Sequence, residues 1–231
     1  MAKITPGSLA GAVSGSLGNC TFAHNRYGYY IRNRVVPTKV VNEWTLAARA
    51  RLIDASQSWG GLTPAQQLAW NTYAESAPIT DALGNKQVLT GHAAYVQVNN
   101  RILVGSGTKV LVPPLVAAPP ALLTMVTTFD IGVGTHTIAY TTTPLAAGNC
   151  LYVQGAVLLN PGQRYFKNRL KLIKVTAAAA ASPYDYLADL QARFGPLVVG
   201  QRVILLASVL SNTSGLISAP YVDEGLVVST P

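Results

Sequence analysis

The sequence predicts an α+β protein in several parts: an extended, basic arm at residues 1–41, a small helical segment at 42–104, a proline-rich linker at 105–120 and an antiparallel β-sandwich at 121–231. Three observations predict this division. The arm is rich in glycine and has no helical period, the next segment has helix-capping residues followed by apolar stripes, and the C-terminal segment has β-branched runs between turn-forming residues. With 49% hydrophobic and 11% charged residues, the chain has enough apolar material for a folded core.

Positive charge is concentrated in the arm. The chain has 17 Lys and Arg against nine Asp and Glu, a formal net charge of +8, and residues 1–40 contain five of the basic residues and no acidic one. This excess favours an anionic partner, whether a nucleic acid, an acidic protein lattice or a membrane surface. Each glycine of the arm would cost a helix about 1 kcal/mol relative to alanine, so extended backbone is expected.

Aromatic residues alternate with basic and polar ones from residue 21 to 36, which predicts either a short hairpin that turns near 25–28 or a strand that pairs with a neighbouring subunit. Tyrosine and arginine are preferred anchors of protein interfaces, and a glycine-rich arm can bind as an added strand or a wrap. Arginine-flanked aromatic side chains can also stack on single-stranded bases, so nucleic acid is the alternative partner. The residues predicted to make the contact are Arg26, Tyr27, Tyr29, Tyr30, Ile31, Arg32 and Arg34.

The helical segment should begin with a capped helix. Asn42 can cap a helix that starts at Glu43, an acid well placed for the positive helix end, and Gly60 supplies the stop. Apolar residues at spacings of three and four predict one apolar stripe along this helix. The stripe consists of Trp44, Ala48, Leu52, Ala55 and Trp59.

A second helix should pack against the first as a hairpin. The sequence from Thr63 to Gln66 forms a capping box with proline at the first helical position, which predicts a helix from Pro64 to about Ser76. A third, short helix is expected at Thr90 to Val104. The large side chains expected in the shared core are Trp44, Trp59, Leu68, Trp70 and Tyr73.

The segment after residue 120 has the pattern of a sandwich, because its β-branched and aromatic runs are separated by turn-formers at regular intervals. Helical spacing after Ser182-Pro183 predicts one short helix, from Tyr184 to Phe194, in a loop. The expected strands are Leu122 to Phe129, Thr135 to Thr142, Cys150 to Leu158, Leu170 to Ala177, Arg202 to Leu210 and Tyr221 to Ser229.

A second basic cluster lies within this segment and contains no acid. Charged and apolar residues alternate in part of it, which is typical of one solvated face of a strand. We treat it as a second candidate binding patch. It consists of Arg164, Lys167, Arg169, Lys171 and Lys174.

No catalytic or metal-binding motif is present in the sequence. His24, His92 and His136 fall in different segments, without a second ligand at metal-binding spacing. The chain has no nucleophile elbow, phosphate loop or dinucleotide fingerprint. We therefore expect a protein that is not an enzyme and uses no cofactor or metal.

The two cysteines and the hydropathy pattern indicate the cellular compartment in which the chain is expected to fold. Cys20 and Cys150 are expected to be free thiols, which fits assembly in a reducing cytoplasm. The uncharged run 110–129 contains four prolines, which would break a membrane-spanning helix repeatedly. No membrane partner is expected.

Two stretches resemble known families. Residues 200–209, followed by Gly215, Ser218, Ala219 and Pro220, resemble the last two strands of a fibronectin type III or immunoglobulin-like module, over about a third of the sandwich. Val203 stands where such modules often have a corner tyrosine. This resemblance implies the fold subtype of the C-terminal segment.

Residues 7–103 resemble a group of proteins from tailed bacteriophages and prophages. The match includes residues 18–22 in a glycine-rich opening, 30–34 before Pro37, 62–67, and 89–91. It departs from the group at 40–43, where an Asn/Thr-Pro helix start is usual.

The phage resemblance implies a structural component of a virion, assembled in the host cytoplasm. The expected role is a minor capsid or decoration (cement) protein anchored by its arm and helices. Its expected partners are the major capsid protein, other virion subunits or further copies of itself. A tail or connector protein, or a nucleic-acid-binding protein that accompanies the packaged genome, is the alternative.

Overall fold

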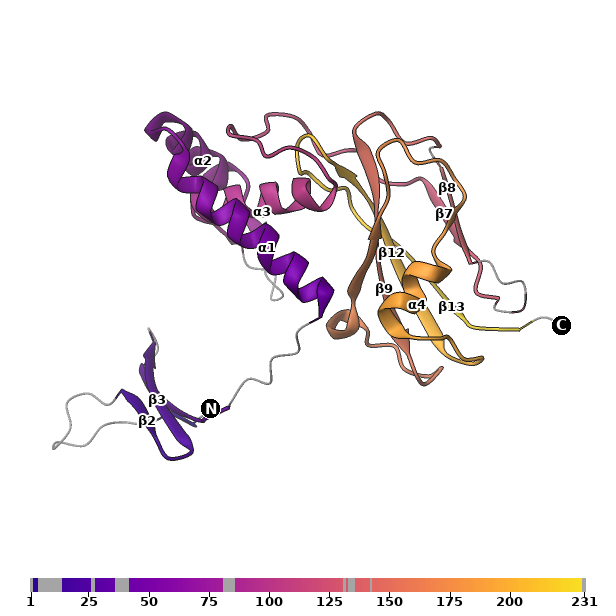
Figure 1. The fold of residues 1–231 in the computed structure, drawn as a ribbon, viewed down its shortest axis with the longest axis horizontal. Coiled ribbons are helices and arrows are strands. Elements are labelled where there is room, and N and C mark those ends of the chain that lie inside the picture. The colour runs from indigo at the N-terminus through magenta and orange to yellow at the C-terminus, as the bar shows by residue number, and fades with distance from the viewer. Residues whose placement is uncertain are drawn as a thin grey trace. The chain divides into compact units, whose positions relative to one another are not determined.

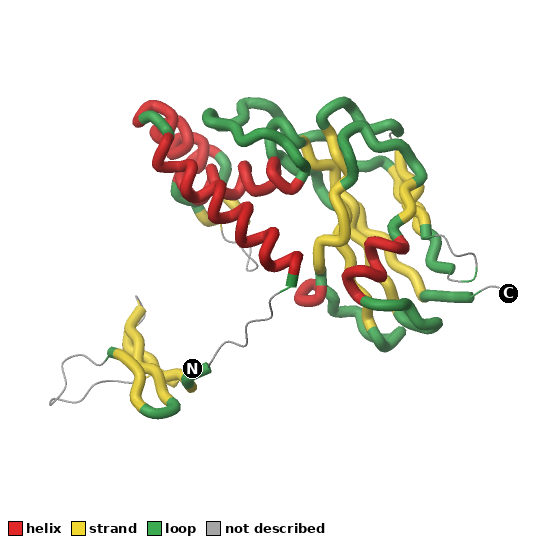
Figure 2. The backbone as a smooth tube through the Cα atoms, viewed as in Figure 1, coloured by secondary structure: helices red, strands yellow, loops and turns green. Residues whose placement is uncertain are grey.

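The computed structural model describes residues 2–3, 14–25, 28–35, 42–80, 86–130, 132, 136–141 and 143–229 (Figures 1 and 2). It contains both helices and antiparallel sheets, so the predicted α+β class is confirmed. The chain divides into two compact units, Met1–Leu46 and Ala47–Pro231. The predicted linker at 105–120 lies within the second of these units.

The N-terminal unit is a small antiparallel sheet with strand order β1-β4-β3-β2. The hairpin alternative is the one present, because β3 and β4 pair antiparallel with Asn25 opposite Gly28. A sheet of four strands replaces the extended arm expected from the sequence. Its strands are β1 (Ala2–Lys3), β2 (Gly15–Leu17), β3 (Cys20–Asn25) and β4 (Gly28–Asn33).

The three predicted helices are present, and the first two begin at their predicted caps. The Asn42 side chain accepts a hydrogen bond from the Thr45 backbone N–H at 2.8 Å, and Thr63 and Gln66 form both bonds of the capping box. These caps satisfy backbone groups that the first helical turn leaves unpaired. The elements are α1 (Glu43–Ser58), η1 (Trp59–Gly61), α2 (Pro64–Ser76), β5 (Ile79–Thr80), β6 (Lys86–Gln87) and α3 (Gly91–Val104).

Helices α2 and α3 make the helical core, in which Trp70 and Tyr95 stack edge to face with ring centroids 5.3 Å apart. The stripe expected on α1 is not buried as a whole. Of its five residues only Ala55 is buried, while Trp44 and Leu52 are exposed. Leu68, also expected in the core, is 66% exposed. The core therefore forms from α2 and α3 rather than from a hairpin of α1 and α2.

The first part of the predicted linker packs on these helices. The buried Asn99 amide donates to the carbonyl of Tyr95 at 3.1 Å and to that of Val110 at 3.2 Å, and it accepts from the Val110 N–H at 2.8 Å. The Trp70 indole donates to the carbonyl of Leu111 at 3.0 Å. One amide thus satisfies both backbone groups of Val110, and the segment closes the helical core.

All six strands predicted after residue 121 are present. Tyr184 and Asp185, which were expected to be helical, instead pair with β8, so the helix α4 starts later. The large sheet has the order β10 (Lys171–Val175), β9 (Asn149–Leu158), β12 (Arg202–Ser211), β13 (Tyr221–Leu226). The small sheet has the order β11 (Tyr184–Asp185), β8 (Thr137–Thr141), β7 (Thr124–Thr127), and α4 (Leu187–Phe194) and η2 (Lys167–Arg169) complete the unit.

The large sheet is buried on both faces. One face shares a core with the small sheet and α4, to which Leu151, Val153 and Leu205 contribute. The other face lies toward the helices, as Figure 1 shows, and its Ile204 and Leu210 are also fully buried. Free Cys150 lies on this second face, and burial raises the pKa of its thiol. Strands covered on both sides read as continuous apolar runs, as β12 does.

We predict that Asn99→Ala lowers the free energy of unfolding by about 2 kcal/mol, because it leaves the N–H and carbonyl of Val110 without their partner. Urea denaturation measures this change. Asn100→Ala, the next residue on the same helix, is the control and should cost much less. Equal losses in the two variants would contradict the role assigned to the Asn99 bonds.

We also predict a pH dependence of stability from His136, which is fully buried and has no well-formed hydrogen bond at either ring nitrogen. Burial lowers its pKa, and the charges of Asp185 and Asp130 oppose this effect only in part. The unfolded chain therefore binds the proton more readily than the folded one. Stability should be fully present above about pH 6.5 and fall as the pH drops from there toward the lower folded-state pKa.

Thermal unfolding of the wild type and of His136→Phe between about pH 5.5 and 7.5 tests this dependence. The variant should show a flatter profile than the wild type. His92→Phe removes one histidine from an exposed site and is the matched control. A wild-type midpoint that does not change over this range would count against the prediction.

Candidate assembly interface

The N-terminal sheet divides the predicted contact residues between its two faces. Antiparallel pairing sets Ile31 opposite Phe22 and Tyr29 opposite His24, so these four side chains share one face. The His24 and Tyr29 rings are 4.5 Å apart between centroids. We call this face, which also includes Leu17 from β2, the apolar face.

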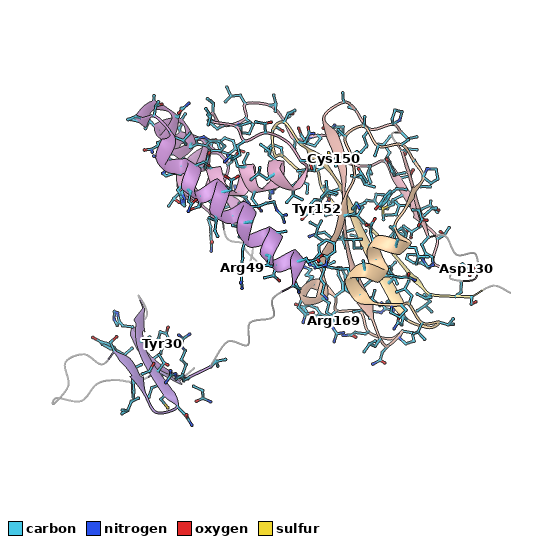
Figure 3. The ribbon with its side chains drawn as sticks, in the orientation of Figure 1. Tyr30, Arg49, Asp130, Cys150, Tyr152 and Arg169 are labelled. Atoms are coloured by element: carbon cyan, nitrogen blue, oxygen red, sulfur yellow. The ribbon has the colours of Figure 1, made fainter. Side chains whose placement is uncertain are left out.

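The opposite face of this sheet is polar. Tyr30, labelled in Figure 3, pairs with Ala23, and Arg32 pairs with Thr21. Arg34 follows the strand and is exposed, and its backbone N–H donates to the carbonyl of Asn19 at 2.6 Å. Tyrosine and arginine side chains that were predicted to act together therefore point in two directions. Arg26 and Tyr27 lie outside the described residues.

The N-terminal sheet has no buried core. No described residue of Met1–Leu46 is buried, Phe22, Tyr29 and Ile31 are half-buried, and Leu17 is 77% exposed. A single layer of short strands is marginal in water unless its apolar face is covered. The apolar face is therefore the part of this unit that gains most from contact with another surface.

The turn between β2 and β3 fixes which residues reach this face. Gly18 has φ 55°, a left-handed conformation that glycine adopts without steric cost, and it is the first residue of a two-residue turn. The turn sets Leu17 opposite Cys20. A slip of one residue would move Leu17 and Phe22 to the polar face.

The second basic cluster is not the single solvated face that its alternation predicts. A β-bulge between Leu172 and Lys174 changes the register of β10. Lys171 lies 4.7 Å from the centroid of the Phe194 ring, and Lys174 forms an ion pair of 3.0 Å with Asp189, so both reach α4. The bulge adds one residue to the strand, which is why both lysines contact the same helix.

The other members of this cluster lie off the strand. Lys167 and Arg169 belong to η2, and Arg164 lies in the loop before it, all three exposed. The cluster is thus divided between two lysines of β10 that contact α4 and three basic residues that precede the strand. This division makes it a weaker candidate than the N-terminal sheet.

A groove on α2 was not anticipated from the sequence. It has a volume of about 510 Å³ and almost wholly apolar walls. Leu68 and Leu115, the latter 93% exposed, stand on its two sides. The helical spacing of residues 65, 68, 69, 72 and 76 indicates such a face, but the sequence pattern led us to expect Leu68 and Tyr73 in the core. The lining residues are Ala65, Leu68, Ala69, Thr72, Tyr73, Ser76, Val112, Pro113 and Leu115.

Within the part of the chain that the structure describes, no group of three or more His, Cys, Asp or Glu side chains is arranged to hold a metal ion. No described helix has the length and apolarity of a membrane span. Comparison with protein-family models, with curated proteins and with solved structures finds no match. Function is therefore inferred from the chain's own residues.

We predict that deletion of residues 1–41 leaves the thermal unfolding of the remaining protein nearly unchanged, because Met1–Leu46 is a unit of its own and its described residues bury no side chain. Asn42 is retained so that α1 keeps its cap. Circular dichroism of the full and truncated chains measures the two midpoints. A fall of more than about 4 °C, equivalent to about 1 kcal/mol, would show that the sheet supports the larger unit.

Proposed function

We propose that this chain is a structural component of a bacteriophage virion, a minor capsid or decoration (cement) protein that is anchored by its N-terminal sheet and its helices. The observation that carries the proposal is the N-terminal sheet, which presents an apolar face and has no buried residue among those described. A single-layer sheet of this kind is only marginally stable alone, and it gains stability when a partner covers its apolar face.

The chemistry of the sheet favours a protein partner over nucleic acid. Phe22 and Ile31 offer apolar area that a phosphate backbone cannot use, whereas protein interfaces bury such side chains at their centre. Arg32 and Arg34 are exposed, and among the described residues neither has an ion-pair partner. Arg34, beyond the end of β4, would meet a carboxylate at the rim of the contact, on the major capsid protein, another virion subunit or a second copy of this chain, whereas Arg32 lies on the opposite, polar face.

The groove on α2 supports a second point of attachment. An apolar groove along a helix fits the side chains of a partner helix or strand, and exposed Leu68 and Leu115 would be covered by it. Attachment through two separate surfaces raises the overall affinity through effective concentration. This supports anchoring by both the N-terminal sheet and the helical segment.

We propose further that residues 121–231 are an immunoglobulin- or fibronectin type III-like module that serves in interaction rather than catalysis. Its support is the pair of antiparallel sheets around one core, together with the resemblance of residues 200–209. Asp223 of β13 accepts hydrogen bonds from the N–H of Thr127 at 3.0 Å and from its hydroxyl at 2.6 Å. These bonds join the two sheets at one edge.

We predict that Leu17→Glu reduces incorporation of the chain into purified particles at least tenfold. A carboxylate on the apolar face would have to be buried at the contact, and a cost of about 1.4 kcal/mol already lowers binding tenfold. Leu17 is mostly exposed, so the substitution should leave the sheet folded. Quantitative mass spectrometry of particles measures the copy number.

Ser16→Glu is the matched control, since it adds the same charge to the adjacent residue on the opposite face. It should be incorporated normally. Normal incorporation of Leu17→Glu would remove the apolar face from the contact, and absence of the wild-type chain from particles would overturn the virion assignment. A particle map locates the chain at the head, connector or tail.

A further inference from the structure

Two arginines lie between the helices and the large sheet without an acidic partner. Leu151 and Val153 of β9 point into the core between the sheets, so Tyr152 and Gln154 point to the other side, toward the helices (Figure 3). Arg51 of α1 and Arg101 of α3 both lie within electrostatic range of Tyr152. All of these residues belong to the unit Ala47–Pro231.

Both guanidinium groups are partly removed from water. The Nε atom of Arg51 is inaccessible to solvent and has no hydrogen-bond partner. Burial is the main effect that lowers the pKa of Arg101, and the tyrosines 152 and 73 oppose it. Arginine stays charged at any physiological pH, so it cannot avoid this cost by losing its proton. A buried charge without a counter-charge is costly.

Three of the described acids form ion pairs with other residues. The described ion pairs are Lys109 with Asp54, Lys174 with Asp189 and Arg202 with Glu224. No carboxylate among the described residues lies within ion-pair distance of Arg51 or Arg101. Arg101 has two tyrosines and no carboxylate among its electrostatic neighbours.

Tyr152 supplies a neutral donor rather than the missing negative charge. Burial raises the pKa of its hydroxyl, and the two arginines only partly reverse this effect. The hydroxyl therefore keeps its proton at neutral pH. The Gln154 side chain lies on the same face of β9 as Tyr152 and acts with the arginines to lower the pKa of its hydroxyl. Two guanidinium groups thus lie within electrostatic range of one neutral hydroxyl, and donors of this kind suit an oxygen-rich anion.

We propose that Arg51, Arg101 and Tyr152 form a binding site for an oxyanion, a phosphate or a carboxylate group supplied from outside the chain. The site is separate from the apolar face and does not depend on the virion assignment. Guanidinium groups bind both kinds of anion in a bidentate way, and the anion replaces the counter-charge that the chain lacks. A bound anion would also link α1 and α3 to β9 through its contacts with these three side chains.

Thermal unfolding in increasing inorganic phosphate, or in increasing citrate, tests the site at constant ionic strength set with chloride. Either anion should raise the wild-type midpoint in a saturable way, as expected for a ligand that binds only the folded state. The double variant Arg51→Gln, Arg101→Gln should lose this rise. Arg49→Gln, at an exposed position of α1 labelled in Figure 3, should keep it. A rise with one anion only identifies the group as phosphate or carboxylate.

The double variant should be at least as stable as the wild type without added anion, because it removes two partly buried charges. Tyr152→Phe gives an independent test, since it retains the ring and should weaken binding severalfold in isothermal titration calorimetry. The proposal is overturned if neither anion changes the wild-type midpoint, or if the rise is the same in the double variant or in Tyr152→Phe.

Discussion

The close approach between α3 and the turn after β12 determines how the larger unit is built. A Cβ atom on Gly107 would lie 2.1 Å from the carbonyl oxygen of Asn212, and one on Gly215 would lie 2.5 Å from that of Val98. Gly215 also has φ 66°, which disfavours other residues. Only backbone without side chains fits here. This contact brings α3 onto the end of β12 and helps to bury Leu210.

Local signals account for what the sequence predicted well. The predicted caps at Asn42 and Thr63 depend on residues at most three positions apart, and both are present. The strands after residue 121 could also be predicted from the sequence, because β-branched runs and turn-formers are local features. The subtype of the sheet arrangement depends on which strands pair, and composition alone does not determine that pairing.

Long-range contacts account for what the sequence did not reveal. The sequence around Val110 predicts a proline-rich linker. In the structure, Asn99, eleven residues earlier, hydrogen-bonds to the Val110 backbone and fixes this segment on the helices. In the N-terminal sheet the register places Tyr29 and Tyr30 on opposite faces, although both were expected at one contact. Arg101 and Tyr152 gave no local signal, because their proximity arises only when α3 packs on β9. Candidate residues can thus be selected by type from sequence, but their grouping needs the fold.

The edge strands of the N-terminal sheet limit what it can assemble into. β1 spans two residues and β2 three, so each edge offers few free backbone groups for another strand. Growth by edge-to-edge pairing, which would give open-ended filaments, is disfavoured. Attachment through the side chains of one face is instead saturable, because each sheet would fill one binding site on its partner. If the sheet is the anchor of the proposed virion protein, this geometry predicts a fixed stoichiometry on the lattice and no polymerisation of the free chain in solution.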